Sequence, residues 1–415
     1  MSTERTPSKR SLTIILIAAL GYFVDIYDLI LFSVVRVRSL EALGAPKDQL
    51  LSNGLLLINM QMGGMLVGGI LWGVLGDKRG RLSVLFGSIA LYSVANVLNG
   101  WVTNVPQYAA LRLVAGIGLA GELGAGITLV SEVMHKEVRG YGTTIVATIG
   151  ILGAVAAVLV GDLFDWRTAY FVGGGLGVGL LVLRVGAFES GMFESVRKSA
   201  VARGRFFDLF SPWPRARKYL AIVGVGVPIW YAVGILVTFS PELGASLGMS
   251  ELPKTGRAVM WCYIGLSAGD FASGALSQII KSRRRALFSF LTLTTVSVVL
   301  YFTVAPTSLV AFYSVVGLLG FSTGYWAVFV TVASEQFGTN LRATATTTAP
   351  NFVRGSLVPV SALFSQLKEP LGVTEAAIAV GVLVLVLAFV SAAALEETFG
   401  RDLDFLEKSG DTPAV

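Results

Sequence analysis

The sequence has almost none of the residue types on which disulfides, metal sites and much enzyme chemistry depend. It holds one cysteine, Cys262, and one histidine, His135, in 415 residues. A single cysteine excludes an intrachain disulfide and a cysteine-based metal cage, and we expect His135, at the edge of a predicted loop, to be solvated. Because the chain also lacks a nucleophile elbow and a phosphate-binding loop, we expect no metal, no other cofactor and no enzymatic activity.

Charged residues are scarce as well. They make up 14% of the chain, whereas an average soluble domain carries about 25%. The 26 acidic and 32 basic residues are too few to solvate the surface of a soluble globule of this length. No soluble domain is predicted that could carry a basic face, so the sequence pI of 9.4 does not indicate a nucleic-acid partner.

Long apolar runs take the place of the missing charges. Hydrophobic residues form 54% of the chain, and the mean hydropathy is +0.73. A transmembrane helix needs about 20 predominantly apolar residues, and the runs predict twelve such helices. Their approximate limits are residues 11–35, 54–76, 82–102, 106–134, 141–162, 168–188, 219–241, 257–280, 286–304, 307–335, 342–366 and 373–395. No signal-peptide cleavage pattern follows the first run, which is therefore expected to be a true span.

The basic residues predict the orientation of these spans. With the N-terminus inside, 23 of the 32 lysines and arginines fall in inner segments and seven in outer segments. Cytoplasmic loops carry such an excess, so we expect a multi-pass protein of the cell (inner) membrane with both termini in the cytoplasm. Two arginines, Arg112 and Arg354, are left inside spans.

A basic segment divides the chain into halves with six predicted spans each. We predict an N-terminal six-helix bundle at 1–189, a cytoplasmic linker at 190–218, a C-terminal six-helix bundle at 219–395 and a cytoplasmic tail at 396–415. Basic residues alternate with aromatic ones along the linker, a pattern that suits a helix lying at the lipid headgroups. A plain charged tether explains the same composition.

The two halves repeat each other in sequence. "SEVMHKEVRGYGTT" from Ser131 aligns with "SEQFGTNLRATATT" from Ser334, and "GVLGDKRGRL" from Gly73 aligns more weakly with "GALSQIIKSRRRAL" from Gly274. In the first pair a glutamate ends one span, and an arginine that opens the next can meet it across a short turn. Repeats at nearly equal offset are typical of transporters that rock two bundles around a central site.

These motifs resemble those of the major facilitator superfamily. "GVLGDKRGRL" is similar to the signature between its second and third helices, and the Glu-x6-Arg pairs, "FESGMF" and "EETFGRDLDFLE" are similar to motifs of its sugar-porter branch. The resemblance implies an all-α membrane protein of two pseudo-symmetric six-helix bundles around a central cavity. It also implies a gate and latch, for which a purely structural role is the alternative, at Gly73, Asp77, Arg79, Gly80, Arg81, Glu132, Arg139, Glu335 and Arg342.

Asp25 and Asp28 interrupt the first predicted span in "GYFVDIYDLILF". A charged residue at the membrane centre costs about 2.5–3.5 kcal/mol on an insertion scale and is usually functional. The stretch resembles the first helix of aromatic-acid and metabolite proton symporters, and Tyr27-Asp28 resembles that of proton-coupled sugar porters. In the latter, an arginine like Arg112 partners the acid, which implies proton coupling at Asp28 and Arg112. Asp25 and Glu122 are expected to tune this site or to contact the substrate.

Two charges in the second half are candidates for substrate recognition. Arg354 in the eleventh run and Asp270 in the eighth lie well inside predicted spans. A buried guanidinium suits an anionic substrate, or it forms a pair with Asp270 or Asp25; both interpretations stay open. The remaining candidate substrate contacts are Tyr27, Glu122, Trp230, Tyr231, Tyr325, Trp326 and Asn351.

The seventh run, "VGVPIWYAVGILVTFSPE", has no glutamine or asparagine, whereas sugar porters have a glutamine-rich run there. We therefore predict a proton-coupled secondary transporter of a small organic metabolite, more specifically a carboxylate, that works as a monomer in lipid by alternating access. The alternatives are a porter or exporter of organic cations or sugar-like compounds and, less favoured, a membrane receptor that senses a substrate on the same fold.

Overall fold

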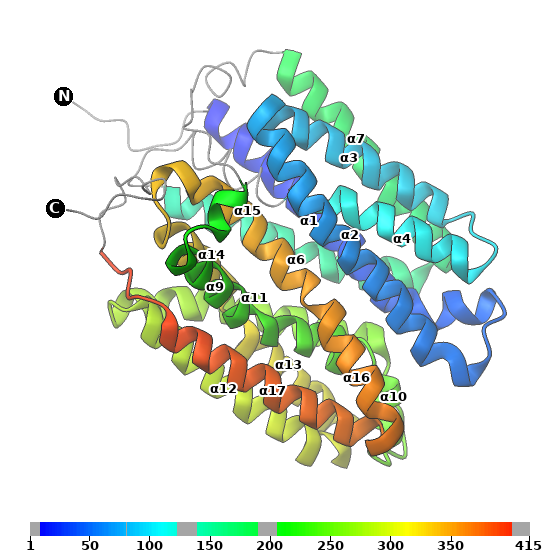
Figure 1. The fold of residues 1–415 in the computed structure, drawn as a ribbon. Coiled ribbons are helices and arrows are strands. Elements are labelled where there is room, and N and C mark those ends of the chain that lie inside the picture. Colours follow the sequence, from blue (N-terminus) through cyan, green and yellow to red (C-terminus); the bar gives the residue numbers. More distant parts are fainter. Residues whose placement is uncertain (1–8, 80, 123–138, 190–205, 401–415) are drawn as a thin grey trace, which may run out of the picture. The chain divides into compact units, whose positions relative to one another are not determined.

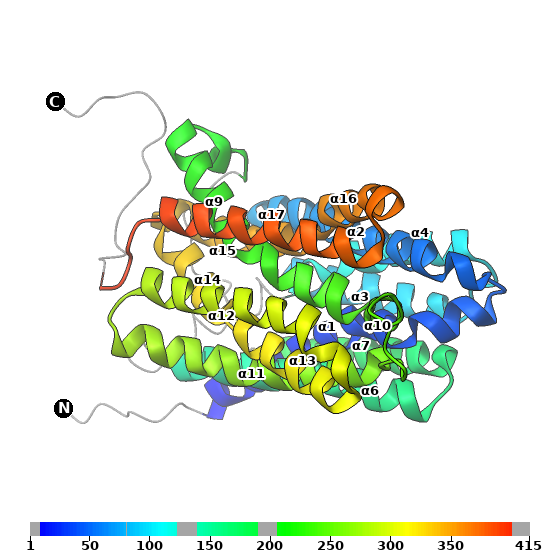
Figure 2. The same cartoon turned by 90° about the horizontal axis from the view of Figure 1, so that it is seen from below.

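The computed structural model describes residues 9–79, 81–122, 139–189 and 206–400. In these ranges the regular elements are all helical and there is no β-strand (Figures 1 and 2). The chain forms two compact units, unit 1 (Met1–Val201) and unit 2 (Ala202–Val415). Each unit is a set of helices packed side by side.

In unit 1 the first helix extends beyond its predicted end. The predicted span stops at residue 35, but α1 runs from Lys9 to Ala42 and includes a fully buried Arg36. The described elements of this unit are α1 (Lys9–Ala42), η1 (Lys47–Gln49), α2 (Leu50–Arg79), α3 (Arg81–Asn99), α4 (Val105–Leu119), α6 (Arg139–Leu163) and α7 (Trp166–Glu189).

In unit 2 several helices are interrupted. Proline at 228 precedes a π-helical turn, and the tenth predicted run is divided at Gly324–Tyr325. The elements are η2 (Phe206–Phe210), α9 (Trp213–Tyr231), the π-helix η3 (Ala232–Val237), α10 (Ser240–Ser246), α11 (Thr255–Ile279), α12 (Arg283–Thr303), η4 (Ala305–Thr307), α13 (Leu309–Thr323), α14 (Trp326–Glu335), α15 (Thr339–Gly355), α16 (Leu357–Leu371) and α17 (Val373–Ala394).

Several helices have the length and composition of membrane spans. Among the described residues, seven helical stretches meet both criteria, and Val84–Asn99, Val105–Leu119 and Ile149–Leu163 are shorter apolar helices. Outward apolar stripes support this, since Val382, Val386 and Val390 on one face of α17 are each more than half exposed and require an apolar environment. The described part of the chain is all-helical, and its apolar helices are those of a membrane protein. The count of twelve spans in two six-helix bundles stays a prediction.

Glycines set how closely the helices approach. In unit 1, α2 packs on α4, while α1 packs on α6 and α7. A Cβ at Gly64 or Gly68 of α2 would collide with backbone carbonyls of α4. In unit 2, α11 packs on α13, and α17 lies along α9 and α12 (Figures 1 and 2). Since lipid provides no hydrophobic drive for helix association, such backbone approach supplies much of the packing energy.

The described part of the predicted linker belongs to unit 2. Residues 206–210 form η2, and α9 begins at Trp213, inside the segment predicted as linker. Phe206 is buried against Phe352, with ring centres 5.9 Å apart. Phe207 and Trp213 are 71% and 68% exposed. The segment therefore alternates anchoring and exposed aromatic residues, as a stretch at a membrane surface does.

Candidate functional site

Two buried carboxylates lie on one face of α1. Asp25 and Asp28 are 0% and 1% exposed, and a spacing of three residues places them on the same side of a helix. The two carboxylates interact electrostatically. Helix α7 passes directly beside them because a glycine stands there: a Cβ at Gly173 would collide with an Asp28 carboxylate oxygen. The two acids thus form one site in the interior of unit 1.

Arg112, the base that the sequence assigns to Asp28, is fully buried on α4 in this same site. Its Nη2 donates to Oε1 of Gln61 on α2, and its guanidinium carbon lies 5.3 Å from the ring centre of Phe32 and 5.8 Å from that of Tyr170. Its charge acts on Asp28. Within the described residues neither Asp28 oxygen forms a well-aligned hydrogen bond. The direct partner of the guanidinium is therefore a neutral amide.

Buried tyrosines complete the surroundings of Arg112. The hydroxyl groups of Tyr108 and Tyr170 are 2.5 Å apart, and they join α4 to α7. Tyr27, which the sequence places among substrate contacts, is fully buried and donates to the carbonyl oxygen of Ala169 at 2.8 Å. This bond fastens α1 to α7 next to the carboxylates.

Glu122 forms a second buried ionic site with Arg184 of α7. The Arg184 guanidinium donates from Nη1 to Oε2 at 3.1 Å and from Nη2 to Oε1, and the two side chains are only 3% and 1% exposed. A Cβ at Gly21 of α1 would collide with both groups. Arg184 is one of the 23 basic residues that the predicted orientation places in inner segments, but it lies within α7 and is buried. The negative charge of Glu122 is thus neutralised inside unit 1.

In unit 2, Arg354 of α15 lies over an aromatic ring. Its guanidinium carbon is 5.8 Å from the ring centre of Trp326, the first residue of α14. Arg354 is 1% exposed, and so is Asn351 one turn earlier, whose Nδ2 donates to the carbonyl oxygen of Thr347 at 3.2 Å. The structure therefore brings three of the predicted substrate contacts, Arg354, Trp326 and Asn351, onto two neighbouring helices.

Asp270 of α11 caps a helix. Its Oδ1 accepts from the backbone N–H of Ala327 at 3.1 Å, in the first turn of α14, and the amide of Trp326 also acts on the carboxylate. A carboxylate is stabilised at a helix N-terminus by the unpaired amides and the helix dipole. The sequence analysis gives Asp270 and Asp25 as alternative partners of Arg354. In the structure Asp270 caps α14.

The remaining predicted aromatic contacts anchor helices. The Tyr325 hydroxyl donates to the Val225 carbonyl oxygen at 2.9 Å, and the Tyr231 hydroxyl donates to that of Ala377 at 2.7 Å. Trp230, next to Tyr231, is 5% exposed. The Tyr325 hydrogen bond connects the break between α13 and α14 with α9, and the Tyr231 hydrogen bond connects α9 with α17.

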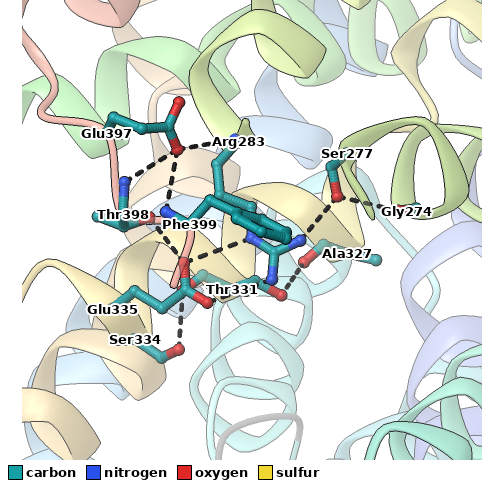
Figure 3. Close-up of polar contacts among 10 residues, drawn as sticks. All are labelled: Gly274, Ser277, Arg283, Ala327, Thr331, Ser334, Glu335, Glu397, Thr398 and Phe399. Carbon is teal, nitrogen blue, oxygen red and sulfur yellow. Dashed lines mark hydrogen bonds and ion pairs between the residues drawn. The ribbon is translucent and has the colours of Figure 1, made fainter. Parts of the chain in front are cut away.

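Glu335, predicted as a latch residue, is held by a base that the sequence did not single out. Arg283 at the start of α12 forms an ion pair with Glu335 at 3.3 Å and donates to Ser277 at 2.7 Å. Its guanidinium lies 5.2 Å from the ring centre of Phe399, and Thr398 donates to Glu335 at 2.6 Å. Figure 3 shows the guanidinium between these groups. One end of unit 2 is therefore closed by a network that joins α11, α12, α14 and the segment after α17.

A second carboxylate of this network, Glu397, caps α12. It accepts from the Ser282 hydroxyl and from the backbone N–H groups of Arg283, Arg284 and Phe399. Partial burial works to raise the pKa of Glu397, but these hydrogen bonds outweigh it and hold the pKa below its ordinary value of 4.5. Glu397, in the motif "EETFGRDLDFLE" that resembles the sugar-porter branch, thus binds the start of α12.

Glu335 and Arg342, which the sequence predicts to meet across a short turn, each have another contact in the structure. Arg342 Nε donates to the Ser334 carbonyl oxygen at 3.0 Å, while Glu335 takes Arg283. In the other half, Gly73 lies in α2. The side chains of the remaining latch residues lie outside the described residues: Asp77, Arg79, Arg81, Glu132 and Arg139, together with Gly80.

Comparison with known proteins identifies the family. A family model for the Major Facilitator Superfamily matches residues 18–362. The chain belongs to the major facilitator superfamily. The resemblance noted in the sequence motifs is thereby confirmed. As a major facilitator, the protein is an integral membrane protein that transports small molecules and is not an enzyme.

Three relatives align with this major facilitator over most of their length. It is 26% identical over 347 residues to a Bacillus subtilis (strain 168) protein named for niacin/nicotinamide transport, which covers 81% of this chain and 84% of the relative. It is 27% identical over 377 residues to the 3-(3-hydroxy-phenyl)propionate transporter of Escherichia coli (strain K12), with coverage of 84% and 85%. The gentisate transporter of Corynebacterium glutamicum is 25% identical over 355 residues, with coverage of 81% and 77%.

Several site residues escaped the sequence analysis. Gln61, Arg184 and Arg283 each contact a charged residue that the sequence did identify. Arg184 could have been recognised from the sequence, because it lies within the sixth apolar run and a buried charge there requires a partner. Gln61 is one of two amide residues in the second apolar run, with Asn59, and nothing in the sequence relates it to Arg112, 51 residues away.

Proposed function

We propose that this major facilitator is a proton-coupled secondary active transporter of a small organic carboxylate, which it moves across the cell membrane by alternating access. Membership of the superfamily supports transport, and the three relatives are named for niacin/nicotinamide, 3-(3-hydroxy-phenyl)propionate and gentisate transport. The observation that carries the choice of a carboxylate is the buried guanidinium of Arg354 over the Trp326 ring.

The Arg354–Trp326 pair has the chemistry to bind a flat acid. A guanidinium presents a planar fork of donors that matches a carboxylate, and a tryptophan face accepts an aromatic ring by stacking. Helices α9 and η3 contain no glutamine or asparagine and therefore offer few partners to a hexose. An organic cation needs a buried acid, and the acid Glu122 is already paired with Arg184. These points support an aromatic carboxylate over a sugar or an amine.

Uptake competition in proteoliposomes tests this choice. Benzoate, nicotinate and 3-hydroxyphenylpropionate are compared with nicotinamide, glucose and tetraethylammonium as competitors. We expect carboxylates to compete best, and we expect Arg354→Lys to weaken their binding at least tenfold, since an ammonium does not reproduce the fork. Equal competition by nicotinamide and nicotinate, or unchanged carboxylate affinity in Arg354→Lys, would contradict the assignment.

Asp28 and Arg112 are the proposed coupling pair. A buried carboxylate is more easily kept protonated when its cation is held elsewhere, and Gln61 holds Arg112 in the described arrangement. If the helices move so that the guanidinium turns from Gln61 to Asp28, the carboxylate releases its proton. Coupling then follows from an exchange of partners by Arg112, with Asp25 adjusting the charge of the site.

Asp28→Asn separates coupling from transport. The amide mimics the protonated acid, so we expect accumulation driven by a pH gradient to be lost while counterflow exchange stays within about twofold. Asp48→Asn, an exposed acid in η1, is the control. Substrate accumulation by Asp28→Asn at wild-type level under a proton gradient would refute coupling at this residue.

We further propose that both termini and residues 190–218 face the cytoplasm. We also propose that the protein works as a monomer with lipid around its helices. The network of Arg283, Glu335 and Glu397 would then be part of the cytoplasmic latch. A cysteine introduced at Ser199 in a Cys262→Ala background tests the orientation. An impermeant maleimide should fail to label it in intact cells. Efficient labelling there would reverse the topology.

A further inference from the structure

Tyr92 of α3 lies between the two buried ionic sites of unit 1. The side chain is fully buried. A Cβ at Gly118 of α4 would collide with the backbone and Cβ of Tyr92, and a Cβ at Gly177 of α7 would lie 3.1 Å from its ring carbon Cε2. The ring is therefore held between α4 and α7. Glu122 follows the end of α4, four residues after Gly118, and Arg184 lies on α7, two turns after Gly177.

The hydroxyl of Tyr92 is within electrostatic reach of both sites. Glu122 and Arg184 act on it from one site, and Asp28 and Asp25 act on it from the other. Among the described residues the hydroxyl has no hydrogen-bond partner. Buried polar groups normally have one, and an orphaned group calls for an explanation such as a transient partner or an exchanging water.

The polar character of this helix face continues beyond Tyr92. Ser93, Asn96 and Asn99 are at most 1% exposed, and their side chains have no well-aligned partner within the described residues. The Asn96 amide faces the Asp28 carboxylate. Positions 92, 96 and 99 share one face, which spans about 10 Å of helix at 1.5 Å per residue. A polar stripe therefore runs along α3, past Asp28, to the last residue of the helix.

We propose that Tyr92 relays protons between Asp28 and the Glu122–Arg184 pair, so that the coupling proton travels inside unit 1 along the polar stripe of α3. The proposal rests on the proposed function, since it requires coupling at Asp28. Protonated Asp28 gives its proton toward the Tyr92 oxygen, directly or through a water, and the Tyr92 O–H passes its own proton to the Glu122 carboxylate. Tyr92 is neutral before and after the transfer.

The relay has a structural consequence at its second end. A proton on Glu122 removes the negative charge that holds Arg184, and the ion pair weakens. The pair lies directly against Gly21 of α1, one turn from Asp25 on the same helix. Arrival of the proton therefore loosens the packing of the helix that carries Asp25 and Asp28. Proton movement and helix movement are linked in this way.

Tyr92→Phe tests the relay, because it removes the hydroxyl and keeps the ring. The matched control is Tyr301→Phe in unit 2, a fully buried tyrosine whose hydroxyl donates to the Leu236 carbonyl oxygen. Both variants are reconstituted with a pH-sensitive dye inside the vesicles, with benzoate as the probe once wild-type protein is shown to transport it. We expect Tyr92→Phe to slow proton uptake at least tenfold while counterflow and thermal stability stay at wild-type level. Proton uptake within twofold of wild type would overturn the proposal.

A second variant keeps the test decisive if Tyr92→Phe folds poorly. Glu122→Gln cannot accept the relayed proton, and it too should lose proton uptake; normal proton uptake in Glu122→Gln would also overturn the relay. Asp28→Asn distinguishes the two proposals. If Asp28→Asn keeps coupling, the proposed function fails at this residue. If Asp28→Asn loses coupling and Tyr92→Phe keeps it, only the relay fails.

Discussion

The helix pair α2–α4 of unit 1 and the pair α11–α13 of unit 2 share one backbone plan. Helices α4 and α13 each have 15 residues, from Val105 and from Leu309, positions 204 apart. Each is preceded by a cap, Asn104 or Ser308, whose side chain accepts from the backbone amide three residues later. The internal repeat seen in the sequence motifs is thus present in the geometry of the two units.

The same glycines make the same contacts in both pairs. A Cβ at Gly64 would collide with a carbonyl oxygen of α4, and a Cβ at Gly265 would collide with one of α13; the two glycines are 201 positions apart. In the opposite direction, a Cβ at Gly116 of α4 would collide with a carbonyl oxygen of α2. A Cβ at Gly320 of α13 would collide with a carbonyl oxygen of α11. The close approach of backbones is therefore the repeated element.

The side chains around this shared backbone differ in polarity. The carbonyl that Gly116 approaches belongs to Gln61, and four residues before Gly116 stands Arg112. The corresponding positions in unit 2 are Cys262 and Val316. Close packing at a glycine does not require a particular side chain at the neighbouring positions. The α2–α4 pair therefore has a buried charged group there, whereas the α11–α13 pair has an apolar contact. The scaffold is thus common to both units, whereas the proposed coupling chemistry belongs to unit 1.

The two pairs also differ where α4 and α13 end, at Leu119 and Thr323. In unit 2, Asp270 of α11 binds the first turn of α14, whereas the position 201 residues earlier is Gly69. In unit 1, Glu122 follows the end of α4 and binds Arg184. Each unit thus places a carboxylate near the end of α4 or of α13, but at different positions and with different partners.

The largest effect is expected from the shared contacts. Gly64→Ala and Gly265→Ala force backbones apart, and overpacking of this kind costs about 3 kcal/mol or more when the backbone must move. We expect most folded protein to be lost in both variants, measured by size-exclusion chromatography and thermal unfolding in detergent. Gly63→Ala and Gly274→Ala, where no atom lies within 4 Å of the added Cβ, should be tolerated. Normal folding of Gly64→Ala would break the proposed equivalence.

A smaller effect is expected at the point where the pairs differ. Gln61→Leu removes the amide oxygen that binds Arg112 and leaves a buried guanidinium without it, at a cost of about 2 kcal/mol. Gln61→Glu keeps an acceptor and should retain stability. Thermal unfolding at matched pH measures both. Wild-type stability of Gln61→Leu would show that Arg112 has another sufficient partner.

A further effect is expected at the break between α13 and α14, where Asp270 binds. Asp270→Ala removes a side-chain cap from α14, which typically costs about 1 kcal/mol, and Trp326 at the start of that helix loses its position beside Arg354. We expect a modest loss of stability and a weaker affinity for carboxylate substrates. Asp270→Asn keeps the accepting oxygen and should restore both. Equal losses in the alanine and asparagine variants would indicate that the negative charge, rather than the cap, matters.

The smallest effect concerns pH and the network at the end of unit 2. Because the pKa of Glu397 is lowered in the folded protein, its stabilisation is present above the ordinary pKa of 4.5 and is lost as the pH falls through the lowered value. Glu397→Gln should therefore be less stable than wild type at pH 7, with the difference shrinking in acid. Thermal unfolding between pH 7 and pH 3 measures it. A difference that does not change with pH would contradict this account.

The sequence alone determined the class of the protein. Apolar runs, the Lys and Arg distribution and the repeated motifs led to a helical membrane protein and to the major facilitator superfamily. The acids Asp25 and Asp28 stood out because a charge inside an apolar run is costly. These inferences rest on local patterns and on composition, which do not require knowledge of which helices touch.

The tertiary structure decided the partners of the buried charges. Glu122 binds Arg184 at a separation of 62 residues, Asp270 binds Ala327 at 57, and Glu335 binds Arg283 at 52. Hydrophobic periodicity predicts that a helix exists, but not its neighbours or its rotation about its own axis. Those depend on glycine contacts between backbones, and a few degrees of rotation or one helical turn of shift changes which guanidinium reaches which carboxylate.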